Sequence, residues 1–194
     1  AQSWERTPDG LTYTFKIRND IKWQNLPPLN GRQFVAADAA FALNRYMSEG
    51  VHRSYYVNVD TIQAVDATTL KIQMKRPVAD FLNPLGSDKQ TIFPKELVDN
   101  GDIQKKVIGT GPMILQEATA GQRVTFTKNP DYFQRKVLLD GFEFKIMPDL
   151  SARLAAFRTG QVEYAYSPVA SPSELDALKK TNSDIQVNMI PLTY

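Results

Sequence analysis

The sequence contains no cysteine and a single histidine among its 194 residues. Without cysteine the chain can form no disulfide, no cysteine nucleophile and no thiolate metal site. With His52 as the one imidazole, a zinc site is not expected, and no acidic residues have the spacing of a calcium-binding loop. We therefore expect neither a metal ion nor a cofactor.

Long apolar runs and a strong net charge are also missing. No apolar stretch is long enough to cross a bilayer, and the opening residues, AQSWERTPDG, lack the basic and apolar regions of a signal peptide. The net charge of +2, without a basic stripe carrying interleaved aromatics, argues against nucleic acid as a partner. The remaining composition, 42% hydrophobic and 23% charged, is ordinary for a globular protein of one domain or two small ones.

In the first half of the chain, hydrophobic periodicity predicts strands, one long helix and two short helices. LTYTFKIR (11–18) alternates as a half-buried strand, and TIQAVD (61–66) with TLKIQMK (69–75) predicts a hairpin. Between them, residues 36–47 have helical period and Gly50 can end the helix. The stripe of that helix comprises Ala36, Ala40, Leu43 and Met47, widened by Ala37 and Phe41. Short helical segments are expected in 76–86 and 93–101.

The second half predicts further strands and two capped helices. MILQEA (113–118) and RVTFTK (123–128) form a hairpin around residues 119–121, and GFEFKIM (141–147) is a strand. Asp149 can cap a helix that ends at Gly160, and Ser171 with Glu174 forms a capping box. QVEYAY (161–166) and DIQVNMI (184–190) are expected as short strands. This order predicts an α+β or mixed α/β fold rather than a regular parallel series.

The glycine-rich stretch KKVIGTGPMIL (105–115) invites comparison with phosphate-binding loops. A P-loop needs Lys and Ser or Thr after its last glycine, and a dinucleotide-binding loop leads into a helix. Here Pro112 and Met113 follow Gly111, and the next element is a strand. We therefore interpret the stretch as a tight turn that begins a strand, in which Gly109 and Gly111 are expected to take positive φ.

Candidates for catalysis are few. His52 would have to serve any Ser-His-Asp triad, but no glycine-flanked serine elbow occurs, and a loop histidine is the simpler interpretation. A two-carboxylate glycosidase site has no supporting pattern. SYYVNVD (54–60) is the densest polar-aromatic cluster, and its tyrosines suit either ligand stacking or a half-buried surface.

Five segments then stand in a familiar order and spacing. They are SWERTPDGLTYTFKIRNDIKWQN, GRQFVAADAAFALNRYM with Ala37, Asp38, Phe41 and Arg45, VDATTLKIQMKRPVADFL, IGTGPMIL, and KNPDYFQRKVLLDGFEFKIMPDLSARLAAFRTGQVE. Together they resemble the family 5 extracellular solute-binding proteins, the dipeptide-, oligopeptide- and nickel-binding components of ABC importers. Departures are Met113 in place of the usual aromatic, Phe133 in place of Trp, Glu163 in place of Asp, and a stretched turn at 26–30.

The resemblance implies a periplasmic-binding-protein-like (class II) lobe fragment with mixed sheets and flanking helices. Residues 1–108 would form the extra subdomain of the first lobe, and residues 109–194 part of the first ligand-binding lobe, ending at the hinge. The second lobe would be absent, which would leave sheet edges in 109–194 open to self-association. The ligand-proximal residues implied by the resemblance are Tyr55 and Tyr56.

The function implied is non-catalytic: capture of a solute, expected to be a peptide, by lobe closure for an ABC importer. Its partners would be the transporter's permease subunits, and it would act in the periplasm or outside the cell, held at the surface as a lipoprotein by an anchor outside this chain. Two alternatives stay open. One is the ligand-sensing domain of a regulatory protein, and the other a hydrolase of peptides or sugars.

Overall fold

The computed structural model describes residues 1–166 and 171–187, and its chain divides into two compact units. The first unit comprises Ala1–Ala118 and Val124–Glu143. The second comprises Thr119–Arg123 and the described residues from Phe144 onward. The boundary at residues 108 and 109 that the family resemblance implies stays a prediction.

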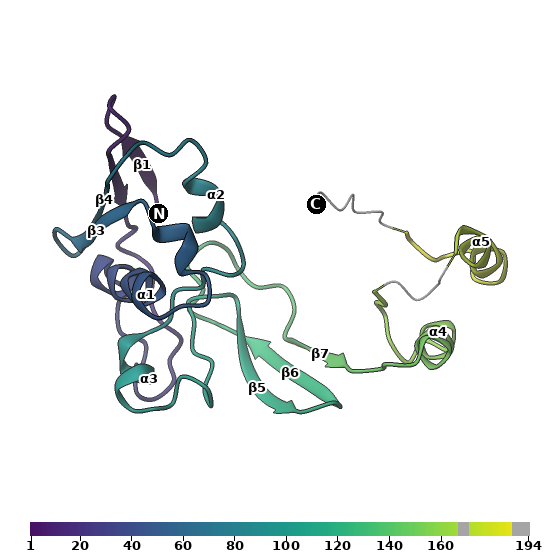
Figure 1. The fold of residues 1–194 in the computed structure, drawn as a ribbon. Coiled ribbons are helices and arrows are strands. Elements are labelled where there is room, and N and C mark those ends of the chain that lie inside the picture. Colours follow the sequence, from purple (N-terminus) through teal and green to yellow (C-terminus); the bar gives the residue numbers. More distant parts are fainter. Residues whose placement is uncertain (167–170, 188–194) are drawn as a thin grey trace. The chain divides into compact units, whose positions relative to one another are not determined.

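A four-stranded antiparallel sheet forms the framework of the first unit (Figure 1), in the order β1-β2-β4-β3. Its strands are β1 (Ser3–Arg6), β2 (Thr12–Lys16), β3 (Val59–Ala64) and β4 (Thr69–Met74). Tyr13 of β2 lies opposite Ile72 of β4, and the two side chains are 1% and 0% exposed. The expected strand at 11–18 and the hairpin around residue 67 are confirmed. β1, whose side chains are all exposed, was not predicted.

Helix α1 (Ala36–Ser48) packs on β3 and β4, and its N-terminal carboxylate explains where it begins. Asp38 at the third helical position accepts the backbone N–H of Val35 at 2.9 Å, which satisfies a donor that the helix itself leaves unpaired. Gly50 follows the C-cap, as expected. The predicted stripe is wrong at Ala37, which is exposed, because the buried arc is centred on Ala36, Ala39, Ala40 and Leu43.

Three short helices complete the first unit: η1 (Arg53–Tyr56), α2 (Leu82–Leu85) and α3 (Lys95–Asp99). The latter two confirm the short helical segments predicted from sequence, and Gly101 after α3 has φ +69°. All three add to one apolar core, since Tyr56, Leu97 and Phe81 (the N-cap residue of α2) are 1–2% exposed. Burying such side chains contributes about 1.5–3 kcal/mol each before entropy is counted.

A second sheet has the order β5-β6-β7, formed by Met113–Thr119, Arg123–Lys128 and Gly141–Lys145. The β5–β6 hairpin turns at Gly121, whose φ is +71°. β7 runs antiparallel to β6, because Lys128 N donates to Asp140 O while Ile146 N donates to Gln122 O. The predicted strands of this region are confirmed.

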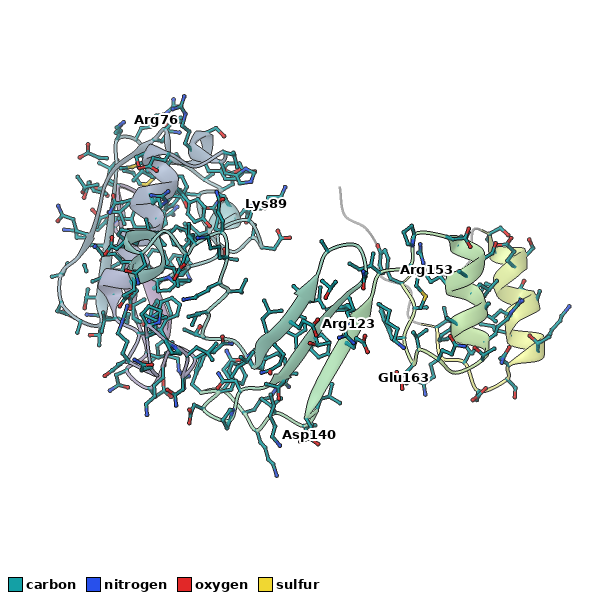
Figure 2. All side chains as sticks on the ribbon, turned by 90° about the horizontal axis from the view of Figure 1, so that it is seen from below. Arg76, Lys89, Arg123, Asp140, Arg153 and Glu163 are labelled. Carbon is teal, nitrogen blue, oxygen red and sulfur yellow. The ribbon has the colours of Figure 1, made fainter. Side chains whose placement is uncertain are left out.

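The second unit contains two capped helices, α4 (Leu150–Arg158) and α5 (Pro172–Thr181). Asp149 accepts the N–H of Ala152 at 2.7 Å, and Ser171 accepts the N–H of Glu174 at 3.3 Å, so both predicted N-caps are confirmed. Arg153, labelled in Figure 2, donates to the carbonyl oxygen of Tyr166 at 3.1 Å.

Two predicted strands of the second unit are wrong. Residues 161–166 form no strand, and neither do 184–187, while the rest of the latter prediction, 188–190, lies outside the described residues. Within the described part of the chain, neither segment has a neighbouring strand to supply ladder hydrogen bonds. Alternating residues favour a strand only where a partner exists. Tyr164 and Tyr166 are accordingly 70% and 68% exposed.

Candidate functional site

The loop after α1 exposes one aromatic and two aliphatic side chains. Val51, Tyr55 and Val57 are 93%, 41% and 62% exposed. The ring of Tyr55 stacks on that of His52, with centroids 5.5 Å apart and planes 7° from parallel. Exposed aromatic and apolar side chains of this kind suit contact with a small ligand.

The two tyrosines predicted near the ligand have opposite environments. Tyr55 is exposed, whereas Tyr56 is 2% exposed and its hydroxyl donates to Gln90 Oε1 at 2.5 Å. Burial and the nearby Tyr46 raise the pKa of Tyr56 to about 12, so its hydroxyl keeps its proton at neutral pH. In this structure Tyr55 alone of the pair presents its side chain to solvent.

The segment between α2 and α3 is fastened to this loop by tyrosine hydroxyls. Besides the bond from Tyr56 to Gln90, Tyr46 of α1 donates to the carbonyl oxygen of Thr91 at 3.0 Å. Gln90 is itself 5% exposed, and its Nε2 has no hydrogen-bond partner among the described residues. Gln90 was not predicted from the sequence, because a lone glutamine 34 positions from Tyr56 carries no local signal.

His52 has no triad partners in the described part of the chain. Its ring contacts Tyr55, and no hydrogen bond joins it to a serine or a carboxylate. No three of the described His, Asp or Glu side chains gather closely enough to hold a metal ion. Likewise, no helix within residues 1–166 and 171–187 combines the length and apolar character needed to cross a bilayer.

The strongest charge cluster is an ionic junction around Arg32. Its guanidinium lies 2.7 Å from Asp38 and 2.6 Å from Glu96. Asp38 also accepts the indole N–H of Trp23 at 3.2 Å. Hydrogen bonding to Asp38 and then to Glu96 raises the pKa of Arg32, and the same contact lowers that of Glu96. Every charge has a partner, so we assign this cluster to folding rather than to ligand binding.

The glycine-rich turn is held by two buried amide side chains. Gln24 donates Nε2 to the carbonyl oxygen of Met113 at 2.7 Å, and its Oε1 accepts the N–H of Gly109 at 3.2 Å. Asn129 donates Nδ2 to the carbonyl oxygen of Gly111 at 2.9 Å. The Gly109 N–H, a donor that a phosphate cradle would need, is thus used within the fold, and β5 begins at Met113, as expected.

The expectation of positive φ at Gly109 and Gly111 is wrong. The positive-φ glycines are Gly10, Gly31, Gly101, Gly121 and Gly160. The turn obtains its geometry from the hydrogen bonds of Gln24 and Asn129 instead of from left-handed backbone. Both amides are 3% exposed, as befits polar groups whose partners are built into the fold.

The sequence matches the model of the bacterial extracellular solute-binding proteins, family 5 Middle, over residues 1–192. The chain belongs to this family. Helices combined with antiparallel sheets, together with similarity to solved periplasmic binding proteins, confirm the expected lobe-fragment fold class.

Individual relatives of this family 5 chain differ in what their names say they bind. The nickel-binding periplasmic protein of Escherichia coli (strain K12) is 31% identical over 170 residues, covering 86% of this chain and 32% of the relative. The glutathione-binding protein GsiB of Escherichia coli O1:K1 / APEC is 32% identical over 197 residues, covering 98% and 37%.

Among solved structures, the periplasmic binding protein DppA from Helicobacter pylori in complex with the peptide STSA has a TM-score of 0.74 and 30% identity, covering 84% of this chain and 36% of that one. The chain thus spans about a third of the length of these relatives, 32–37%.

Proposed function

We propose that this family 5 chain belongs to the solute-binding component of an ABC importer and captures its ligand without catalysis. The observation that carries the proposal is the family match over residues 1–192. Binding would proceed by closure of two lobes, of which this chain supplies much of the first, and the ligand would shift the population toward the closed state. Residues 1–108 would form the extra subdomain of the first lobe, and residues 109–194 part of the first ligand-binding lobe, ending at the hinge.

The ligand class we propose is a short peptide. Relatives named for glutathione and solved with the peptide STSA support it. Peptides offer backbone carbonyl and N–H groups and two charged termini, which proteins recognise by hydrogen bonds and charge pairing. Because one relative is named for nickel binding, a chelated metal is the alternative ligand class.

Tyr55 is the proposed contact residue, and Tyr56 its support. The exposed ring of Tyr55, already stacked on His52, can extend that stack onto a ligand group. Tyr56 would support Tyr55 from the protein interior, because its hydrogen bond to Gln90 fixes the backbone of η1. Both assignments rest on the family resemblance and on the exposed or buried position of each ring.

The proposal extends to partners and location. Permease subunits of the transporter would receive the closed protein. It would work in the periplasm or outside the cell, held at the surface by a lipid anchor. We also keep the proposal that residues 109–194 mediate self-association, which Phe144 supports by being 56% exposed on the outer strand β7.

A panel of thermal unfolding curves tests the function. A ligand that binds only the native state raises the unfolding midpoint. We expect short peptides or glutathione to raise the midpoint of the intact protein, and Tyr55→Ala to reduce that shift while leaving the ligand-free midpoint nearly unchanged. No shift with glutathione, di- and tripeptides or nickel chelates would contradict the proposal.

A further inference from the structure

One buried donor in the first unit is not used by the fold. Gln90 is 5% exposed, its Oε1 accepts the Tyr56 hydroxyl, and its Nε2 has no partner within the described residues. Buried polar groups in native proteins are nearly always hydrogen-bonded, since an unpaired one loses its hydration without replacement. An unpaired buried donor therefore calls for a partner outside the described residues, such as a water molecule or a ligand group.

The contrast with the other buried amides sharpens this point. Gln24 and Asn129 are 3% exposed, and both donate to backbone carbonyl oxygens of the glycine-rich turn. Gln90 has the same amide group and nearly the same burial, yet its Nε2 has no hydrogen-bond partner among the described residues. The fold can satisfy buried amides where their role is structural, so the spare donor of Gln90 points to another role.

The position of Gln90 connects it to the candidate site. Its bond to Tyr56 joins it to the residue next to Tyr55, whose exposed ring stacks on His52. The Tyr56 hydroxyl donates to Gln90 Oε1, so Oε1 is the acceptor of this bond. This leaves Nε2 as the group available to a ligand.

The segment that carries Gln90 lies at the surface, and its local backbone hydrogen bonds are long. The N–H groups of Ser87 and Gln90 each donate to a backbone carbonyl at 3.2 Å, long for such bonds. The neighbouring Lys89 is exposed, and Figure 2 shows its side chain projecting away from the ribbon. Because Gln90 is 5% exposed, binding of a solute by its amide would require this segment to shift.

We propose that Gln90 Nε2 is a ligand-binding group that donates a hydrogen bond to a carbonyl or carboxylate oxygen of the captured solute. This inference rests on the proposed function and adds a specificity-determining residue to the site of Tyr55. A neutral N–H donor selects an acceptor oxygen and offers nothing to a bare cation. It therefore favours peptide-like solutes, with Lys89 nearby to attract a carboxylate.

The sharpest variant is Gln90→Glu, which keeps an acceptor for the Tyr56 hydroxyl and replaces the donor by a carboxylate oxygen. In calorimetric titrations of the intact protein with glutathione and trialanine at about pH 8, where a carboxyl is normally ionised, we expect the affinity to fall at least roughly tenfold. The matched control is Gln104→Glu, the same charge change at an exposed position, and its affinity should stay at the wild-type value.

Two further measurements separate donation from mere packing. Lowering the pH should restore part of the affinity of Gln90→Glu, because a protonated carboxyl donates again, but should restore none in Gln90→Leu. In the wild type, the nitrogen-edited NMR signal of the Gln90 side-chain NH₂ group should shift on addition of glutathione. This second readout needs no variant, so it serves even if a substitution prevents folding.

The outcomes divide cleanly. If wild type binds either probe while Gln90→Glu binds equally well and the NH₂ signal does not move, the inference is overturned and the proposed function stands. If neither probe binds the wild type, the peptide-binding function falls, and the role of Gln90 falls with it. Loss of binding that recovers at low pH supports both.

Discussion

At the scale of residues, Arg32 places one guanidinium between the carboxylates of Asp38 and Glu96. It thereby joins the start of α1 to α3, and its guanidinium also lies 5.8 Å from the centre of the Trp23 ring. The Asp38 carboxylate is 6% exposed, so without this cation its charge would be left buried. The junction explains why segments 64 positions apart pack together.

We predict that Arg32→Met destabilises the protein by roughly 2–4 kcal/mol, somewhat below the range for a fully buried pair because Arg32 is partly exposed. Arg45→Met is the matched control, since its pair with Glu49 is exposed and worth about 0–1 kcal/mol. Urea unfolding of both variants measures the difference. Equal losses of unfolding free energy in the two variants would show that the ionic junction stabilises the fold no more than an exposed ion pair.

Acid should weaken the same junction. The bond to Arg32 lowers the pKa of Glu96 from 4.5, so the unfolded state binds its proton more readily than the folded state. The resulting stability is complete above the ordinary pKa and is lost as pH falls through the lowered one. Asp66 acts in the same direction at lower pH, because bonds from Thr68 and Thr69 lower its pKa to about 2.

Glu96→Gln should therefore make the free energy of unfolding less dependent on pH between about 5 and 3. Urea titrations at several pH values measure that slope in variant and wild type. The wild type should lose stability more steeply across this interval. A slope that the substitution leaves unchanged would contradict the assigned role of Glu96.

Residue patterns predicted the aromatic loop but not its support. The cluster SYYVNVD pointed to Tyr55 and Tyr56, because polar-aromatic density is visible in sequence. Which ring is exposed, and that the other reaches Gln90, depends on how η1 turns and where a distant loop lies. Glutamine and asparagine residues occur throughout the sequence. Nothing in the sequence therefore distinguished Gln24 and Asn129 as the residues that hold the glycine-rich turn.

At the scale of elements, local sequence patterns predicted a helix or strand correctly where the element depends only on nearby residues or has a pairing partner. Caps at Asp149 and Ser171 were predictable because the capping bond is made within three residues. The strands at 161–166 and 184–187 failed because a strand needs a partner, which periodicity does not supply. β1 was missed because all its side chains are exposed and its pairing with β2 is the main evidence for it.

Replacing either of two glycines by alanine should change the stability of the protein in opposite directions. Gly121→Ala should cost about 1 kcal/mol, because φ is +71° there and a Cβ is strained in that region. Gly111→Ala should be neutral or stabilise by up to about 1 kcal/mol, because its φ is ordinary and nothing lies within 4 Å of the added carbon. Denaturant unfolding of the two variants would contradict this if Gly111→Ala were the more damaging.

At the scale of the whole molecule, the chain was predictable as a family member. Motif order over most of the sequence identified the family that the match over 1–192 then confirmed. Compact units follow contacts between distant residues, and these join 119–123 to the part after Phe144. The subdomain boundary at residue 108 is a division of another kind and stays a prediction.

Self-association is also a property of the whole chain. We predict that the 194-residue chain forms concentration-dependent oligomers in analytical ultracentrifugation. Phe144→Lys should reduce them, because a charge on an edge strand blocks pairing with another chain. Leu138→Lys, at a more exposed position outside the strands, should have little effect. A monomer at all concentrations would contradict the proposed role of the sheet edge.

The central claim is that this family 5 chain serves solute capture, and native mass spectrometry of the intact protein purified from its producing cells tests it most directly. Proteins that close around a ligand often retain it, since closure slows release. We predict a complex heavier than the polypeptide that releases a ladder of short peptides on denaturation. A protein that carries no solute and acquires none from a peptide mixture would contradict the account.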